Sequence, residues 1–273
     1  MTHNRSIDWN NKIAVITGAS SGIGAATARK LATQGLIVIL VARRQDRLER
    51  LAKEIELAGG RAVAIPADLS QESERQRVYD QIESEFGPVE VLINNAGLGW
   101  YGYGTDMPWK IASEILQVNI SATVHFSLLF LKNMRRLGSG HIINIGSISG
   151  SLPSQGIAIY GASKSFLDNF TTALYRELAG TNLHVSVVRA GPVSTEFCDR
   201  AADLPYGRPM PTERIGVSAD TIAGHVWKLL KKPRRVVYVP SWLGITPYVE
   251  TFFGWFIDRL GPLLLCSQTR DTK

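Results

Sequence analysis

Short apolar runs alternate with longer amphipathic runs along most of the chain. The short runs are rich in branched side chains and lie between turn-forming residues, which predicts buried β-strands. The longer runs repeat apolar residues every three or four positions and predict helices. We expect strands at 12–17, 36–42, 62–65, 89–93, 142–147, 185–188 and 235–239. We expect helices at 22–34, 47–58, 70–86, 111–137, 157–178 and 219–230. Whether the helix over 111–137 is continuous or broken stays open.

This alternation predicts an α/β fold, a single doubly wound domain with a mostly parallel seven-stranded sheet and helices on both faces. The domain takes in residues 1–273, with its core at about 12–240, because no linker divides the chain. Apolar residues make up 45% of the chain and charged residues 20%, which is ordinary globular composition. Open sheets of this kind bind ligands at the carboxyl ends of their strands, so the residues that follow each strand are the candidates for function.

A glycine-rich loop joins the first strand to the first helix. Its spacing is G-x-x-x-G-x-G, which differs from the G-x-G-x-x-G of the dinucleotide fingerprint. Glycines let the backbone turn tightly and approach a pyrophosphate, whose charge the N–H groups at the helix start attract. The position of the loop favours a nucleotide cofactor over a plain turn. The candidate residues are Gly18, Ser20, Ser21, Gly22, Ile23 and Gly24.

Two arginines, Arg43 and Arg44, follow the second strand. An Asp or Glu near this position would accept a hydrogen bond from the ribose 2′-hydroxyl of NAD(H). A guanidinium suits a 2′-phosphate instead, because it can donate two hydrogen bonds to it. We therefore predict NADP(H) as the cofactor, with Arg43 at the 2′-phosphate and Ser21 in support. At least one of the two arginines is expected to be a solvated loop charge.

Other strand ends carry further candidates for cofactor contact. Asp68, followed by Leu69, either accepts from an adenine amino group or caps the next helix, and the sequence leaves the two readings even. The small and amide residues after the fourth strand suit a cofactor wall and also a plain turn. The hydroxyl and Gly-Pro segment after the sixth strand suits a nicotinamide carboxamide. These candidates are Asn95, Ala96, Gly97, Gly191, Val193 and Thr195.

Two segments are candidate walls for a substrate. Residues 98–108 form an aromatic, glycine-rich loop that includes Trp100 and Tyr101. Residues 196–216, with Phe197 near their start, are irregular and rich in proline. Such a composition is typical of a mobile lid over a binding site and equally of a plain surface loop.

Ser147, Tyr160 and Lys164 form the candidate catalytic group. Ser147 ends the fifth strand, and the helical spacing after it places Tyr160 and Lys164 one turn apart on one face. A nearby ammonium lowers the pKa of a phenol, so we expect Tyr160 to exchange a proton near neutral pH while Ser147 holds the receiving oxygen. Taken alone, Tyr-x-x-x-Lys is also an ordinary surface pair. Asn119, on an apolar helix face, is either a satisfied core amide or part of a proton path.

Together these motifs resemble the short-chain dehydrogenase/reductase family. The resemblance rests on TGASSGIG at 17–24, NNAG at 94–97, Asn119, Ser147 and Tyr160-x-x-x-Lys164, and it covers roughly residues 12–240. One departure is Ala190-Gly191, where the family usually has Pro-Gly.

The resemblance implies a Rossmann fold and a role for each catalytic candidate. Tyr160 would be the acid/base, Lys164 would lower its pKa and bond the nicotinamide ribose, and Ser147 would orient the carbonyl. Asn119 would hold a water in a proton relay. Asp68 would contact the adenine, and Gly191, Val193 and Thr195 would lie in the cofactor-contacting segment after the sixth strand.

The implied reaction is hydride transfer between NADPH and a carbonyl, or the reverse oxidation of an alcohol. Two other classes stay open. A non-catalytic NADP(H)-binding regulator or scaffold would not need the full set of catalytic residues. A nucleotide-sugar epimerase usually has a longer chain and holds NAD, which Arg43 disfavours. We also expect a homodimer or homotetramer.

Residues 242–268 form an amphipathic extension beyond the family motifs. Glu250, Asp258 and the prolines exclude an ordinary membrane-spanning helix. Its apolar stripe either packs on its own domain, forms a subunit interface or lies on a membrane surface, and the basic residues at 228–235 support the last. In each case we expect an apolar pocket and a lipophilic carbonyl substrate. The stripe consists of Ile245, Tyr248, Val249, Phe252, Phe253, Phe256 and Leu260.

Charge and cysteine content limit the other partners. The net charge is +6, but no nucleic-acid motif accompanies it, so we expect no nucleic-acid partner. Cys198 and Cys266 match no metal or redox spacing, and the five histidines are scattered, so we expect no metal. The first residues lack the apolar core of a secretory signal. A cytoplasmic setting is expected, with peripheral contact on the inner membrane face as an open alternative.

Overall fold

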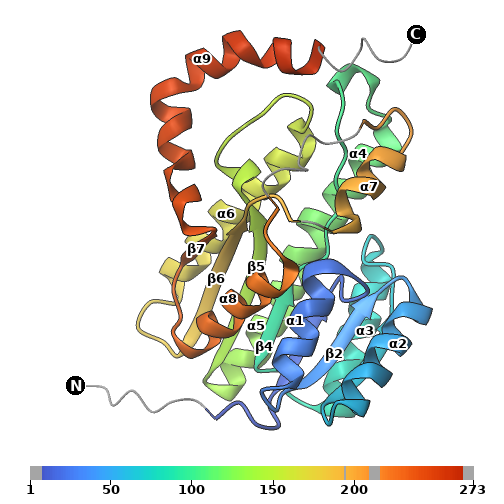
Figure 1. Ribbon diagram of the computed structural model, residues 1–273. Coiled ribbons are helices and arrows are strands. Elements are labelled where there is room, and N and C mark those ends of the chain that lie inside the picture. The colour runs from blue at the N-terminus through green and yellow to red at the C-terminus, as the bar shows by residue number, and fades with distance from the viewer. Residues whose placement is uncertain (1–7, 194, 209–215, 267–273) are drawn as a thin grey trace.

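A seven-stranded parallel sheet forms the centre of the protein (Figure 1). The computed structural model describes residues 8–193, 195–208 and 216–266, with side chains as far as Arg259. The spatial order of the strands is β3-β2-β1-β4-β5-β6-β7, and each neighbouring pair is parallel. The strands are β1 (Ile13–Thr17), β2 (Ile37–Ala42), β3 (Arg61–Pro66), β4 (Val91–Asn94), β5 (Gly140–Ser147), β6 (Leu183–Ala190) and β7 (Val236–Val239).

Helices cover both faces of this sheet. On one face α1, α2 and α8 bury Leu31, Leu51 and Val226 against the strands. On the other, α3, α5 and α6 contribute Ile82, Phe126 and Leu174. The helices are α1 (Gly22–Ala32), α2 (Gln45–Leu57), α3 (Glu72–Phe86), α4 (Trp109–Leu116), α5 (Thr123–Leu137), α6 (Ala158–Glu177), α7 (Glu196–Asp203), α8 (Ala219–Lys231) and α9 (Thr246–Cys266). The predicted doubly wound fold is confirmed, and strand order reverses between β1 and β4, where such folds bind ligands.

The predicted helix over 111–137 is interrupted. A π-helical segment, η2 (Gln117–Ala122), lies between α4 and α5. The stretch Trp109–Leu137 is long and apolar enough to cross a membrane by length and composition alone. Phe126 and Phe130 of α5, however, are buried against the sheet, so this stretch is a core element of the fold.

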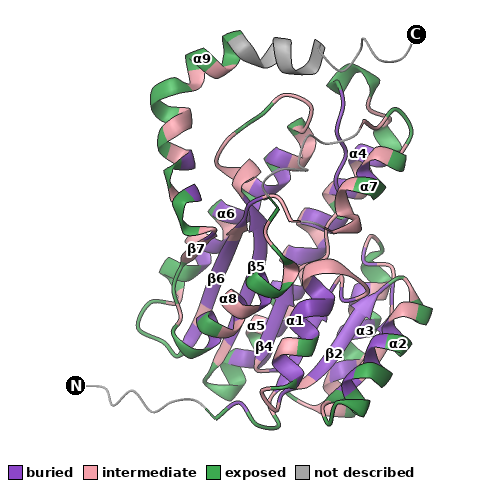
Figure 2. Cartoon of the chain, viewed as in Figure 1, coloured by how far each residue is buried: buried purple, intermediate pink, exposed green. Residues whose placement is uncertain are grey.

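The extension differs most from expectation. α9 leaves the sheet at the carboxyl end of β7 and reaches away from it, with most of its residues up to Arg259 exposed (Figure 2). Tyr248 is 63% exposed and Trp255 68%. Within the single chain the apolar face therefore does not pack on its own domain, which corrects that alternative. Leu260 of the predicted stripe lies outside the described side chains.

The basic residues at 228–235 do not lie beside α9. They stand at the end of α8 and the start of β7, whereas α9 follows the other end of that strand. The strand β7 separates the basic residues from α9, because the chain enters β7 at the amino end of the sheet and leaves it at the carboxyl end. Nearness in sequence therefore gave a wrong picture of this cluster.

Candidate active site

A cavity of about 590 Å³ lies at the carboxyl ends of β1, β4, β5 and β6. Its wall combines the glycine loop, the strand ends, α6 and α7, which are far apart in the sequence. Of the residues predicted for cofactor or substrate, it is lined by Gly18, Ser20, Ser21, Gly22, Ile23, Arg43, Asn95, Ala96, Gly97, Ser147, Tyr160, Lys164, Gly191, Val193, Thr195 and Phe197.

The glycine loop needs its glycines. Gly18 and Gly22 have φ of +65° and +52°, a region that favours glycine. A Cβ on Gly24 would lie 2.4 Å from the carbonyl oxygen of Gly18, so α1 can approach the loop only without a side chain there. The Asn95 amide donates to the carbonyl oxygens of Thr17 (2.9 Å) and Gly18 (3.2 Å) and ties the loop to β4. The backbone at the start of α1 is thus held open for an anion.

Ser147, Tyr160 and Lys164 meet at the end of β5. Ser147, Tyr160 and Lys164 all line the cavity, and Lys164 Nζ lies 5.7 Å from the centre of the Tyr160 ring. The ammonium donates a 2.9 Å hydrogen bond to the carbonyl oxygen of Ile145. Ser147 also accepts from the backbone N–H of Ser149 at 3.1 Å, which fixes the hydroxyl at the cavity wall.

Burial dominates the electrostatics of this group. It raises the pKa of Tyr160 to about 12, against the lowering effect of the Ser147 side chain. It also lowers the pKa of Lys164 to about 8, against the raising effect of Asp168. The predicted lowering of the Tyr160 pKa is wrong here, because lost hydration of the phenolate outweighs the lowering effect of Ser147. Tyr160 is therefore a protonated acid at neutral pH.

Asn119 is a satisfied core amide. Its Oδ1 accepts from the backbone N–H of Leu98 at 2.8 Å, and its Nδ2 donates to the Leu98 carbonyl oxygen and to Ser163 Oγ. The residue is buried in the π-helical segment and does not line the cavity. Its side chain holds the backbone of Leu98, which follows β4, against α6. These contacts do not support the water relay that the resemblance implies.

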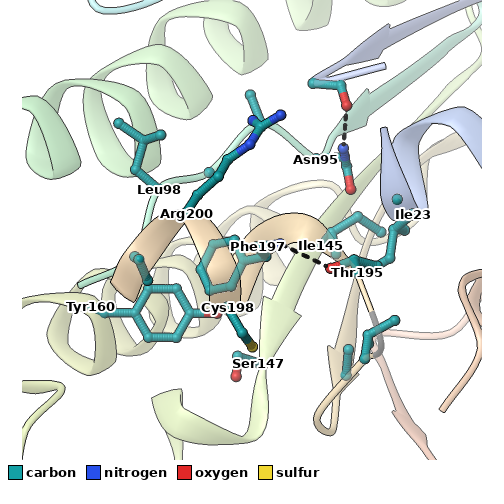
Figure 3. Close-up of a pocket in the computed structure, with 18 of the residues that line it drawn as sticks. Ile23, Asn95, Leu98, Ile145, Ser147, Tyr160, Thr195, Phe197, Cys198 and Arg200 are labelled. Carbon is teal, nitrogen blue, oxygen red and sulfur yellow. Dashed lines mark hydrogen bonds between the residues drawn. The ribbon is translucent and has the colours of Figure 1, made fainter. Parts of the chain in front are cut away.

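The start of the predicted lid is the helix α7, which closes over Tyr160. The Phe197 and Tyr160 ring centres are 5.4 Å apart, and Figure 3 shows Phe197 and Cys198 on the cavity side of α7. A Cβ on Gly99 would lie 2.5 Å from the Phe197 ring. The glycine in the 98–108 loop therefore leaves room for the Phe197 side chain. Residues 209–215 of the lid lie outside the described residues.

The comparisons with known proteins agree with this geometry. The family model for short chain dehydrogenase matches residues 12–203. An uncharacterized oxidoreductase of Staphylococcus epidermidis is 33% identical over 225 residues, which are 82% of this chain and 93% of that one. The chain belongs to the short-chain dehydrogenase/reductase family. The predicted resemblance is confirmed, and the family is one of oxidoreductases.

Solved structures of this family superpose closely. A short-chain dehydrogenase/reductase from Burkholderia phymatum in complex with NAD has a TM-score of 0.81 and 25% identity, covering 90% of this chain and 94% of that one. An actinorhodin polyketide ketoreductase with NADPH has a TM-score of 0.77 and 28% identity, covering 86% and 97%.

Besides Asn119, five of the predicted residues do not line the cavity. Gly24 packs inside the glycine loop, and Leu69 is buried in the core. Asp68 accepts from the backbone N–H of Ser70 at 3.0 Å and closes the turn before α3, so it neither caps the first helical turn nor faces the cavity. Trp100 donates to the Pro205 carbonyl oxygen, and Tyr101 packs on Gly156, so both brace the loops behind the wall.

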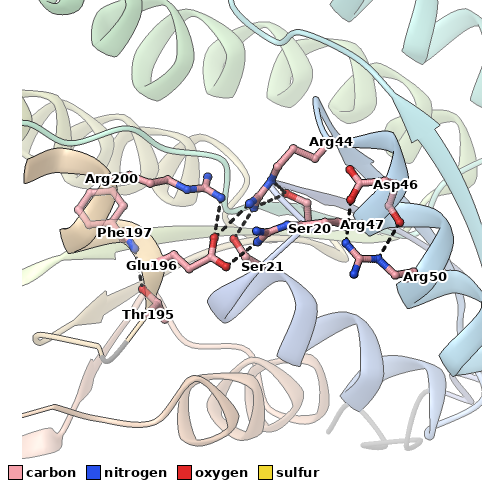
Figure 4. Close-up of polar contacts among 10 residues, drawn as sticks. All are labelled: Ser20, Ser21, Arg44, Asp46, Arg47, Arg50, Thr195, Glu196, Phe197 and Arg200. Carbon is pink, nitrogen blue, oxygen red and sulfur yellow. Dashed lines mark hydrogen bonds and ion pairs between the residues drawn. The ribbon is translucent and has the colours of Figure 1, made fainter. Parts of the chain in front are cut away.

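Sequence reasoning missed a charged cluster beside the glycine loop. Arg43 lines the cavity but pairs with Glu114 at 2.8 Å. Arg44 donates instead to Ser20 Oγ and Ser21 Oγ (Figure 4). Glu196 of α7 pairs with Arg44 at 3.1 Å, next to Thr195 and Phe197, which line the cavity. The adjacent residues Arg43 and Arg44 in the sequence indicated the arginine side of this cluster. No local pattern indicated Glu196.

Three features of the cavity fit a dinucleotide cofactor. Positive φ and close contacts leave bare backbone at the glycine loop. The start of α1 and the Ser20 and Ser21 hydroxyls offer donors for phosphate. Gly97 lines the cavity beside Lys164 and adds no side chain there.

Proposed function

We propose that the protein is an NADPH-dependent carbonyl reductase that acts on a lipophilic substrate and also catalyses the reverse alcohol oxidation. The observation that carries this proposal is the meeting of Ser147, Tyr160 and Lys164 in the same cavity as the glycine loop. A cofactor along the loop and a carbonyl at Tyr160 would share one enclosed space.

The cofactor would be held by the glycine loop, by Asn95 and Thr195 along the wall, and by Arg43 and Arg44 at a 2′-phosphate. When bound, NADPH supplies the hydride for the carbonyl carbon. Tyr160, protonated because burial raises its pKa, donates its proton to the carbonyl oxygen as negative charge develops there. Ser147 donates a hydrogen bond to the same oxygen. The Lys164 ammonium then favours the tyrosinate that remains.

A lipophilic substrate is supported by the wall around Tyr160. Leu98, Ile111, Ile115, Phe197 and Leu204 line that end of the cavity. A polar substrate would lose hydration there without recovering hydrogen bonds, whereas apolar groups gain from burial. The ketoreductase among the structural relatives is consistent with carbonyl reduction.

The test is NADPH oxidation against carbonyl compounds of graded size and apolarity, with Tyr160→Phe as the matched variant. We expect turnover that rises with apolarity and a loss of about 10² to 10⁴ in kcat for the variant, because only the transferable proton is removed. NADPH binding, followed by its fluorescence, should be unchanged. Binding without turnover of any compound would favour the regulator or scaffold, and substantial activity of Tyr160→Phe would refute the mechanism.

We infer that a second copy of the chain covers α9. Its aromatic face is bare, and its polar face carries Glu250 and Asp258, which repel anionic lipid. Aromatic residues and few charged residues are typical of interface cores. Replacing both Phe252 and Trp255 with Ser should lower the mass measured by light scattering. An unchanged mass together with lost flotation on vesicles would overturn this inference in favour of a membrane surface.

A further inference from the structure

Glu196 lies at the centre of a cluster of guanidinium groups beside the glycine loop (Figure 4). Its Oε2 accepts from Arg200 at 2.7 Å and from Arg44 at 3.1 Å, and its Oε1 accepts from Arg47. Arg200 belongs to the same helix, α7, whereas Arg44 immediately precedes α2 and Arg47 lies within it. The carboxylate therefore links α7 to the start of α2.

The cluster is built as an anion site. The Arg44 guanidinium also donates to Ser20 Oγ at 2.9 Å and to Ser21 Oγ at 2.8 Å. These hydroxyls belong to the loop that leads into α1, whose first turn adds the positive end of its dipole. Ser21, at the N-cap position of α1, uses its hydroxyl as an acceptor for Arg44 and leaves the helix start open.

The acceptor that this cluster holds is a side chain of the protein itself. The pKa of Glu196 is lowered to about 2, mainly by Arg47 and then by Arg44, so the carboxylate is ionised throughout the physiological range. A carboxylate and a phosphate compete for the same guanidinium geometry. A phosphate carries more charge and one more terminal oxygen, so it is the stronger ligand.

We propose that Glu196 occupies the subsite of the cofactor 2′-phosphate and competes with it, so that Glu196 sets the discrimination between NADPH and NADH. This inference rests on the proposed function for the identity of the cofactor. NADPH must displace the Glu196 carboxylate from Arg44 and Arg47. NADH has only a 2′-hydroxyl and leaves these ion pairs in place. Glu196 thus weakens NADPH binding selectively.

The displacement also reaches the substrate end of the cavity. Phe197 follows Glu196 directly on α7, and its ring centre lies 5.4 Å from that of Tyr160. Release of Glu196 from the arginines removes the contacts that hold the first turn of α7 to the region of α2. NADPH, unlike NADH, therefore loosens the lid over Tyr160 when it binds.

Calorimetry with NADPH, NADH, 2′,5′-ADP and 5′-AMP tests the competition without turnover. For Glu196→Gln we expect NADPH and 2′,5′-ADP to bind about three- to tenfold more tightly, the range of one or two partly exposed ion pairs. NADH and 5′-AMP should bind as to the wild type. Glu196→Asp, with a shorter carboxylate, should fall between. Asp199→Asn is the matched control, because it removes the same charge from the first turn of the same helix.

Two results would overturn the inference. Weaker binding of NADPH and NADH alike would show that Glu196 clasps the bound cofactor instead of competing with it. Equal affinities of the Gln variant and the wild type for 2′,5′-ADP would show that the carboxylate is not in the phosphate subsite. Wild-type protein that binds neither nucleotide would refute the proposed function as well, so the two failures are distinguishable.

Hydrogen exchange of α7 gives an independent readout. NADPH should raise amide exchange in residues 196–203 of the wild type, and NADH should not, because only the 2′-phosphate releases the carboxylate. In Glu196→Gln the exchange should be high already and change little with either cofactor. Protection of α7 by NADPH in the wild type would contradict the displacement.

Discussion

Lys164 Nζ donates a 2.9 Å hydrogen bond to the carbonyl oxygen of Ile145, two residues before Ser147 on the same strand. The contact fixes the buried ammonium against β5 and therefore relative to Ser147. It also leaves two of the three ammonium protons for other acceptors in the cavity. The geometry of the proposed catalytic group is thus set by the strand as much as by the helix.

The pH dependence of turnover should report on this ammonium. The pKa of Lys164 is about 8, so its charge is present at neutral pH and is lost as pH rises through that value. We expect kcat for carbonyl reduction to fall on the alkaline side with an apparent pKa near 8. Lys164→Met should lose this limb and turn over on the order of tenfold to a hundredfold more slowly throughout. A flat wild-type profile up to pH 10 would contradict the assignment.

The two arginines after β2 should differ in their effects. Arg44 contacts Ser20 and Ser21, whereas Arg43 pairs with Glu114 on the rim of the cavity. We expect Arg44→Ala to weaken NADPH binding about tenfold, since it loses a charged hydrogen-bond donor to the phosphate, and to leave NADH nearly unchanged. Arg43→Asp should weaken NADPH and spare or favour NADH, because a carboxylate repels the phosphate and accepts from a 2′-hydroxyl. Cofactor titrations by fluorescence check both, and faster wild-type turnover of NADH at equal concentration would refute the NADPH assignment.

A buried ion pair near Lys164 should matter for stability. Asp168 Oδ2 lies 3.0 Å from Arg189 Nε, and their side chains are 7% and 15% exposed. Arg189→Met should lower the free energy of unfolding by about 3 kcal/mol, because it leaves a buried carboxylate without its partner. Adding Asp168→Leu should recover much of that loss, as the unpaired charge is then gone. Urea denaturation measures both, and a double variant no more stable than the single one would contradict the explanation.

His141 should make the fold sensitive to acid. Burial lowers its pKa to about 3, so the folded chain stays unprotonated there while the unfolded chain binds a proton below its ordinary pKa of 6.5. Stability should therefore fall as pH falls from 6.5 toward 3, by on the order of 2 kcal/mol between pH 6 and pH 4 from this group. His141→Gln, which can keep the hydrogen bond to Ser186, should have the shallower dependence in thermal melts at those pH values. Parallel curves would rule out the imidazole as the cause.

The sequence predicted the sheet and the strand-end residues well because both follow from short-range patterns. Apolar runs mark buried parallel strands. Because all the strands run in one direction, the glycine, serine and asparagine residues that follow them gather at the carboxyl ends of the sheet. Ser147, Tyr160 and Lys164 needed only a strand end and one helical turn to be brought together.

The errors arose where long-range packing decides the outcome. The pKa of Tyr160 depends on burial, which a Tyr-x-x-x-Lys pattern does not encode. Glu196 meets Arg44 across 152 positions of sequence, so no local pattern predicts the pair. Trp100 and Tyr101 point behind the wall that they were expected to form. The basic residues that precede α9 in sequence lie at the amino end of the sheet, whereas α9 follows its carboxyl end.

The π-helical segment η2 changes the rotational phase of the helix that contains it. A π turn holds roughly one residue more than an α turn, which rotates the preceding turns by about 100° relative to an unbroken helix. Ile111 and Ile115 before it line the cavity, whereas Phe126 and Phe130 after it pack on the sheet. In a continuous α-helix, Ile115 and Phe126 would point in nearly the same direction. The wide turn therefore lets one apolar stripe face two different neighbours, and deleting one residue from 117–122 would turn Ile111 and Ile115 away from the cavity.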